Sequence, residues 1–157
     1  MGSIKSVLFI CTGNSCRSVM AEGLLKKRLN ELGKTGIIVR SAGLRALDGY
    51  SPMDETIEVM AAAGVDVNTF KSTAITKDMV KAADLILVMA ASHKYEITRR
   101  VPAAAAKTFL LREYGITAGE KTPADTDIPD PIGLSIPEYQ ACLDAIKKEV
   151  ERVADIL

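Results

Sequence analysis

Short apolar runs rich in β-branched residues alternate along this chain with stretches whose apolar residues recur three and four positions apart. The four runs cover residues 7–10, 37–40, 85–89 and 108–111. The third run, LILVM, is apolar at every position, as expected of a strand with both faces covered by helices. Alternating strands and helices favour a parallel sheet with right-handed crossovers. We therefore expect an α/β fold of three layers, α/β/α, around a central four-stranded parallel sheet.

The remaining pattern predicts helices and one long loop. The predicted helices cover residues 19–32, 53–63, 77–82, 92–100 and 137–156. At 157 residues the chain has the length of one compact domain, so residues 1–157 are expected to form a single domain. Residues 122–131 are rich in Pro and Asp and form the expected long loop, a kind of segment that is often functional.

Charge and hydropathy exclude several classes of partner. Lys plus Arg and Asp plus Glu both number 20, so no overall field favours nucleic acid or an anionic membrane. The longest apolar stretch, residues 85–91, is far shorter than the roughly 20 residues of a membrane span. The start of the chain lacks the layout of a signal peptide, and three cysteines do not suit a secreted disulfide framework. We expect a cytoplasmic protein without nucleic-acid or membrane partners.

The first apolar run leads directly into residues 11–18, CTGNSCRS, where a helical pattern begins. A strand-to-helix loop can aim successive backbone N–H groups at an oxyanion, and the helix N-terminus adds unpaired donors. Gly13 and Asn14 tolerate the left-handed angles that a tight loop needs. This field favours a thiolate at Cys11, and the planar Arg17 side chain can clamp two phosphoryl oxygens. The pattern predicts a phosphate cradle with a cysteine nucleophile.

These residues also have plainer interpretations. A cysteine after a buried strand is more often inert packing than a nucleophile, and the spacing to Arg17 is what favours chemistry at Cys11. Ser18 suits a helix N-cap, and its hydroxyl could also hydrogen-bond the Cys11 thiolate. Cys16 could form a reversible disulfide with Cys11 or be a plain core residue, and Cys142 is expected in the core.

In these residues the chain resembles the low-molecular-weight protein tyrosine phosphatase family, whose signature is C-x-G-N-x-C-R-S near the N-terminus. The resemblance extends to Ser41-Ala42-Gly43, to Ala83-Asp84 and to Asp130-Pro131, and so covers essentially the whole chain. It implies a phosphatase that acts through a cysteinyl-phosphate intermediate.

The resemblance also implies residue roles. Cys11, Arg17 and Asp130 are expected to be catalytic, with Asp130 as the proton donor to the leaving group and then the base for water. Ser41 is expected to support the loop. The residues expected to bind the phosphoryl group and the substrate are Thr12, Gly13, Asn14, Ser15, Cys16, Ser18 and Ile132. Asp125 and Asp127 lie near Asp130 as loop residues.

No cofactor or metal is expected, because cysteine chemistry needs none and the acidic residues of the late loop lack a recognised cation-loop spacing. The expected partners are phosphorylated protein substrates and the phosphate ion. The family suggests a monomer or a weak homodimer.

The chain departs from the family pattern at several positions. Val19 stands where the family usually has Pro, and a bracing histidine would align near Phe70. His93, the only histidine, is expected on a helix surface.

Tyrosine-specific members commonly place aromatic residues where this chain has Ile132 and Gly133. Ser15 stands where the bacterial protein-arginine phosphatase branch has threonine. Phosphotyrosine is placed first and phosphoarginine close behind it, ahead of phosphoserine. Arsenate reduction and non-catalytic phosphate sensing stay as alternatives from other classes.

Overall fold

A computed structural model describes residues 3–116 and 126–157 of the chain. Its centre is a sheet of four parallel strands in the spatial order β2-β1-β3-β4. The strands are β1 (Ser6–Cys11), β2 (Ile38–Gly43), β3 (Leu85–Val88) and β4 (Thr108–Leu110). The expected parallel sheet is confirmed, and each strand begins and ends within three residues of its predicted bounds.

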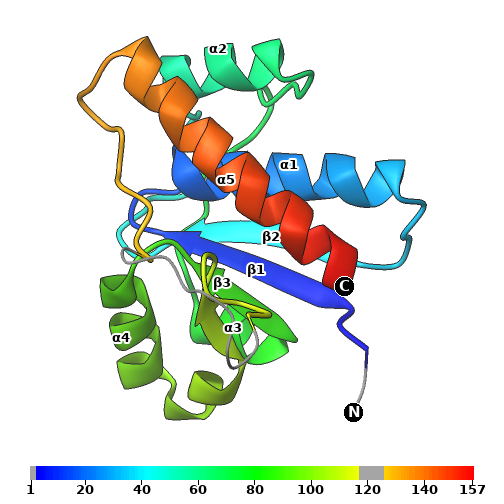
Figure 1. The fold of residues 1–157 in the computed structure, drawn as a ribbon. Helices are drawn as coiled ribbons and strands as arrows, with labels where there is room; N and C mark the ends of the chain where they lie inside the picture. Colours follow the sequence, from blue (N-terminus) through cyan, green and yellow to red (C-terminus); the bar gives the residue numbers. More distant parts are fainter. Residues whose placement is uncertain (1–2, 117–125) are drawn as a thin grey trace.

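Helices cover both faces of this sheet (Figure 1). On one face lie α1 (Arg17–Glu31), α2 (Asp54–Ala62) and α5 (Ile136–Ile156). On the other face lie α3 (Lys77–Ala82) and α4 (Ala91–Arg100). The three expected layers are therefore present. A short 3-10 helix, η1 (Pro102–Lys107), precedes β4 and was not expected from the sequence.

The central strand β1 contributes to two hydrophobic cores because its side chains alternate between the faces. Val7, Phe9 and Cys11 belong to the core beneath α1, α2 and α5. Leu8 and Ile10 belong to the smaller core beneath α3 and α4. Full burial of one such apolar side chain contributes about 1.5–3 kcal/mol. The strand is thus held from both sides, and Cys11 lies at its carboxyl end.

The start of α1 differs from the expected one. The N-cap is Cys16, whose carbonyl oxygen accepts from the Met20 N–H at 3.0 Å. Ser18 is the second residue of the helix, so the expectation that it caps the helix is wrong. Its hydroxyl lies against Cys11 instead of the helix terminus. Val19 is buried in the first turn, where it replaces the proline usual in the family.

The described part of the segment before α5, residues 126–135, passes beside the end of β1 (Figure 1). The Ile128 N–H donates to the carbonyl oxygen of Met89, just after β3, at 2.8 Å. Asp125 and the first part of the predicted loop 122–131 lie outside the described residues. Among the described helices, none combines the length and the apolarity that a membrane crossing requires.

Gly43 allows the end of β2 to approach the loop that follows β1. A Cβ atom built on Gly43 would lie 2.7 Å from the Thr12 carbonyl oxygen and 2.8 Å from the Asn14 backbone nitrogen. Both atoms belong to backbone, which cannot swing aside as a flexible side chain can. Glycine is therefore required at this contact for a steric reason.

We predict that Gly43→Ala destabilises the protein by about 1–3 kcal/mol, as overpacking does, and displaces residues 12–16. The measurements are urea unfolding and amide hydrogen exchange of that loop. Gly33→Ala is the control, because Gly33 has a positive φ of 69° but open space around its Cβ position. The control should lose stability without faster exchange in residues 12–16. Unchanged exchange of the loop in Gly43→Ala would contradict the assignment.

Candidate active site

The loop of residues 12–16 joins the carboxyl end of β1 to the first turn of α1. Its neighbours donate to its carbonyl groups: the Leu44 N–H donates to the Cys11 oxygen at 3.0 Å and the Arg45 N–H to the Thr12 oxygen at 2.9 Å. Within the described residues, the N–H groups of residues 12–16 donate to no protein atom. A loop whose carbonyls are bonded outward and whose N–H groups are unpaired is suited to an oxyanion. The loop therefore has the backbone geometry that the predicted anion cradle requires.

The buried Asn14 side chain braces this loop. Asn14 has a φ of 52°, the left-handed conformation that its residue type tolerates. Its Nδ2 donates to Ser18 Oγ at 2.8 Å and to Ser41 Oγ at 3.0 Å, while its Oδ1 accepts from the Thr73 N–H at 2.9 Å. Ser41 Oγ in turn donates to Glu22 at 2.7 Å. The contact expected for Ser41 exists, and Thr73 and Glu22 were not foreseen.

Phe70 lies near the position expected for a bracing histidine, and it packs against the larger hydrophobic core. The oxygen of Asn14 accepts from the backbone at Thr73 instead. This hydrogen bond identifies which end of the Asn14 amide carries the oxygen. The Asn14 side chain is therefore held without a histidine.

Cys11 lies at the base of the cradle, and its side chain is buried. Its Sγ lies 2.9 Å from Ser18 Oγ. Because Asn14 Nδ2 donates to that same oxygen, the hydroxyl hydrogen of Ser18 is available to the sulfur. The Ser18 hydroxyl is thus placed to donate a hydrogen bond to the sulfur. This geometry suits a nucleophile that also has to leave as a thiolate.

Arg17 connects the cradle to the late loop. Its side chain is 6% exposed, and its Nη1 donates to the Ile128 carbonyl at 2.9 Å. Its Nη2 lies 3.5 Å from both Thr12 Oγ1 and the Asp130 carboxylate. The Asp130 side chain is 38% exposed, as a group at the mouth of a site would be. The structure thus brings the three predicted catalytic residues, Cys11, Arg17 and Asp130, to one end of the sheet.

Asp127 anchors the segment that carries Asp130. One oxygen of its carboxylate accepts from the N–H of Ala91, the first residue of α4, at 2.8 Å. The backbone oxygen of Asp127 accepts from Arg112 at 2.8 Å. A carboxylate at a helix N-terminus is favoured by the helix dipole. The sequence offered Asp127 only as a loop residue, and the structure shows that it ties this loop to α4.

The other two cysteines lie in the core. Burial raises the pKa of the Cys16 thiol, whose sulfur lies 3.7 Å from the Tyr139 hydroxyl. Burial raises the pKa of Cys142 to about 12. All three cysteines are free thiols, and the core position expected for Cys142 is confirmed. The possible disulfide between Cys11 and Cys16 stays a prediction.

His93 is buried, so the expectation that it lies on a helix surface is wrong. Its exposed fraction is 4%, and its Nε2 lies 3.0 Å from Thr12 Oγ1. The first turn of α4 follows β3 at the carboxyl edge of the sheet, and this placement turns His93 toward the cradle. A histidine just after a predicted parallel strand was the signal that could have identified it.

Exposed apolar residues lie in two segments that contact the site. Ile132 is 47% exposed next to Asp130, and its N–H donates to the Asp130 carboxylate at 3.1 Å. Leu47 and Tyr50 are exposed in the segment 45–53. Both ends of that segment donate backbone hydrogen bonds to cradle carbonyls.

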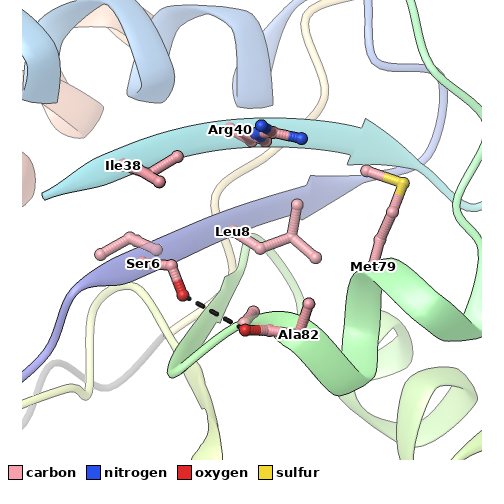
Figure 2. A pocket seen from close by; sticks show the side chains of 8 residues that line it. Ser6, Leu8, Ile38, Arg40, Met79 and Ala82 are labelled. Carbon is pink, nitrogen blue, oxygen red and sulfur yellow. Dashed lines mark hydrogen bonds between the residues drawn. The ribbon is translucent and has the colours of Figure 1, made fainter.

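A separate hollow of about 240 Å³ lies between the edge strand β2 and α3 (Figure 2). Ile38, Arg40, Leu8 and Met79 line it, together with Ser6, which starts β1 at the end opposite Cys11. The described residues that line it include no cysteine, histidine or carboxylate. The hollow therefore lacks the groups for the predicted chemistry.

Comparison with known proteins connects this site to a family. Residues 6–157 match the sequence model of low molecular weight phosphotyrosine protein phosphatase. The probable low molecular weight protein-tyrosine-phosphatase EpsP of Ralstonia nicotianae is 36% identical over 94% of this chain and 92% of that protein. The protein-arginine-phosphatase of Geobacillus stearothermophilus is 33% identical over 96% of this chain and 95% of that protein.

A solved structure agrees with these sequence matches. It is a cysteine-to-serine mutant of the arginine phosphatase YwlE whose active site serine is phosphorylated. It superposes with a TM-score of 0.87 and 31% identity, over 97% of this chain and 95% of that chain.

The bracing network leads to a prediction for Asn14. Asn14→Ala removes three hydrogen bonds in a buried region and leaves their partners unsatisfied, so a loss of about 2–4 kcal/mol in unfolding free energy is expected. Urea unfolding measures this loss. Asn30→Ala, on the exposed part of α1, is the control and should change stability by less than about 0.5 kcal/mol. Equal effects of the two substitutions would refute the bracing role.

The buried histidine makes stability depend on pH. Burial and the nearby positive charge of Arg17 lower the pKa of His93 from 6.5 to about 4, and the carboxylates of Asp127, Asp130 and Glu96 oppose this only in part. Below pH 6.5 the His93 ring therefore binds a proton in the unfolded chain, while in the folded chain it stays neutral until the pH nears 4. The stability contributed by neutral His93 is complete above the unfolded pKa and is lost as the pH falls toward 4.

We predict that lowering the pH from 7 to 4 costs the wild-type protein about 3 kcal/mol more unfolding free energy than it costs His93→Gln. Chemical denaturation across this range measures the difference. The carboxylates titrate in both proteins, so their contribution cancels when the two pH dependences are compared. Parallel pH profiles of the two proteins would show that the ring of His93 titrates normally.

Proposed function

Because this chain belongs to the low molecular weight phosphotyrosine protein phosphatase family, we propose that Cys11, Arg17 and Asp130 hydrolyse phosphorylated protein side chains through a cysteinyl-phosphate intermediate. The observation that carries the proposal is the cradle itself. The Cys11 sulfur lies 2.9 Å from the Ser18 hydroxyl at its base, and the Arg17–Asp130 pair lies 3.5 Å apart beside it.

In the first step the Cys11 thiolate attacks phosphorus, and an S–P bond forms as the bond from phosphorus to the leaving group breaks. Asp130 gives its proton to the leaving oxygen of tyrosine, or to the leaving nitrogen of arginine. The free N–H groups of residues 12–16 and the Arg17 guanidinium stabilise the charge on the equatorial phosphoryl oxygens. The products are the dephosphorylated side chain, a neutral phenol for tyrosine or a guanidinium for arginine, and a phosphocysteine.

In the second step water attacks the phosphocysteine. The Asp130 carboxylate takes a proton from the water, the S–P bond breaks, and the electron pair returns to Cys11 as a thiolate. The Ser18 hydroxyl lies within hydrogen-bond distance of that sulfur and stabilises the leaving thiolate. Release of phosphate restores the enzyme.

The mouth of the site supports phosphotyrosine as the first substrate class. Leu47, Tyr50 and Ile132 are exposed in the two segments that contact the cradle and Asp130, and we expect them to offer apolar area to a phenol ring. The side chain of phosphoserine is too short to contact these apolar residues.

Phosphoarginine is the second candidate, and the Ser15 side chain favours it. Ser15 Oγ makes a weak contact, 3.8 Å long, to Cys16 Sγ, and its hydroxyl could accept a hydrogen bond from a guanidinium group. One of the relatives described above is a protein-arginine-phosphatase.

Arsenate reduction and phosphate sensing have less support. A resolving cysteine has to reach the nucleophile as a thiolate, whereas burial raises the pKa of both Cys16 and Cys142. A sensor would need no general acid, yet Asp130 lies beside Arg17. We further propose a monomeric or weakly dimeric state, as the family resemblance implies, and a cytoplasmic location.

The test is phosphate release from phosphotyrosine and phosphoarginine peptides of matched sequence. Wild-type protein is expected to prefer phosphotyrosine, and Cys11→Ser should abolish release. Asp130→Asn should lower kcat by about 10²–10⁴ because it removes the general acid.

Asp144→Asn, a carboxylate on the exposed side of α5, is the matched control and should keep wild-type kcat. Release that survives Cys11→Ser would contradict the covalent mechanism. A preference for phosphoarginine would reverse the order of substrates. No release from either peptide would favour a sensor.

A further inference from the structure

His93 is buried against the cradle, although neither chemical step described above uses it. It is the third residue of α4, and its Nε2 lies 3.0 Å from the hydroxyl oxygen of Thr12, the residue that follows Cys11. We propose that His93 is a positioning residue that orients the Thr12 hydroxyl as a hydrogen-bond donor to the phosphorylated substrate. This inference rests on the proposed phosphatase function and adds a residue to it.

The hydrogen bonds around Thr12 determine which way its hydroxyl points. Arg17 Nη2, which can only donate, lies 3.5 Å from Thr12 Oγ1. The other ring nitrogen of His93, Nδ1, is buried and has no partner among the described residues. A buried N–H without an acceptor costs more than an unused acceptor. The ring of His93 therefore carries its hydrogen on Nε2 and donates it to Thr12.

The Thr12 oxygen then accepts two hydrogen bonds, one from His93 and one from Arg17, and both of its lone pairs are used. Its own hydrogen has to point elsewhere. The Thr12 side chain is half-buried and lies against the guanidinium of Arg17, so a phosphoryl oxygen or the leaving atom of a substrate held by Arg17 can accept that hydrogen. His93 thus turns a freely rotating hydroxyl into a fixed donor.

The same contact connects α4 to the catalytic arginine. Thr12 lies between His93 and Arg17, and Arg17 also contacts Asp130. Loss of the His93 contact would release Thr12 and with it one partner of the guanidinium. The expected defect is in transition-state stabilisation, which appears in kcat more than in KM.

The test uses two polar replacements that differ in reach. The amide nitrogen of His93→Gln can occupy the place of Nε2, whereas that of His93→Asn occupies the place of Nδ1 and cannot reach Thr12. With p-nitrophenyl phosphate as substrate, we expect His93→Asn to lower kcat about tenfold with little change in KM, and His93→Gln to stay within about threefold of wild type. Tyr95→Leu, an exposed change on the same helix, is the control.

A double-mutant cycle with Thr12→Val identifies the route of the effect. If His93 acts through the Thr12 hydroxyl, His93→Asn has no further effect on kcat in the Thr12→Val background. An equal loss in both backgrounds would overturn the proposal, as would equal kcat values for the Gln and Asn variants. Thermal unfolding of each variant verifies that the compared proteins are folded.

The outcomes separate this inference from the proposed function. If wild-type protein shows turnover that depends on Cys11 while His93→Asn is as active as wild type, the inference alone fails. If wild-type protein releases no phosphate, the proposed function fails and the inference fails with it.

Discussion

The three hydrogen bonds of the buried Asn14 amide hold the loop on which the rest of the site depends. They join the loop to α1 through Ser18, to β2 through Ser41 and to the backbone at Thr73. A left-handed residue held from three directions has little freedom to move, so the backbone around it keeps its conformation without a bound ligand. Oxyanion stabilisation is effective when donors are oriented before the reaction, because no free energy is then spent on turning them.

The sheet positions this loop, and Arg17 connects the loop to the acid Asp130. β1 lies between β2 and β3 with both faces buried, so Cys11 at its end has little freedom. The guanidinium of Arg17 then contacts the Ile128 carbonyl and the Asp130 carboxylate. Nucleophile and clamp come from one strand-loop-helix segment and the acid from a distant part of the sequence, yet each is one or two contacts from the same loop.

The strands and helices were predictable because their signals are local. Residues 85–89 are apolar without interruption, and this pattern is typical of a strand covered on both faces. The expected contact of Ser18 with Cys11 is present, but its expected N-cap role and the expected surface position of His93 are wrong for the opposite reason. Ser18 has the residue type of an N-cap, but its hydroxyl contacts Cys11, seven residues earlier. His93 lies on a helix with many polar residues, and it is the packing of α4 against the cradle that buries it.

The sequence by itself determined the fold class, the strand order along the chain and the Cys11–Arg17 cradle. The apolar strand runs and the residues 11–18 motif are each made of residues that lie close together in the sequence. Only the tertiary structure decided that Asp127 anchors the acid loop to α4, that Glu22 and Thr73 complete the bracing of the cradle, and that His93 contacts Thr12. These contacts join residues between 19 and 81 positions apart. Such pairs meet because the carboxyl ends of parallel strands lie at one edge of the sheet. No local sequence pattern indicates which side chains will meet there.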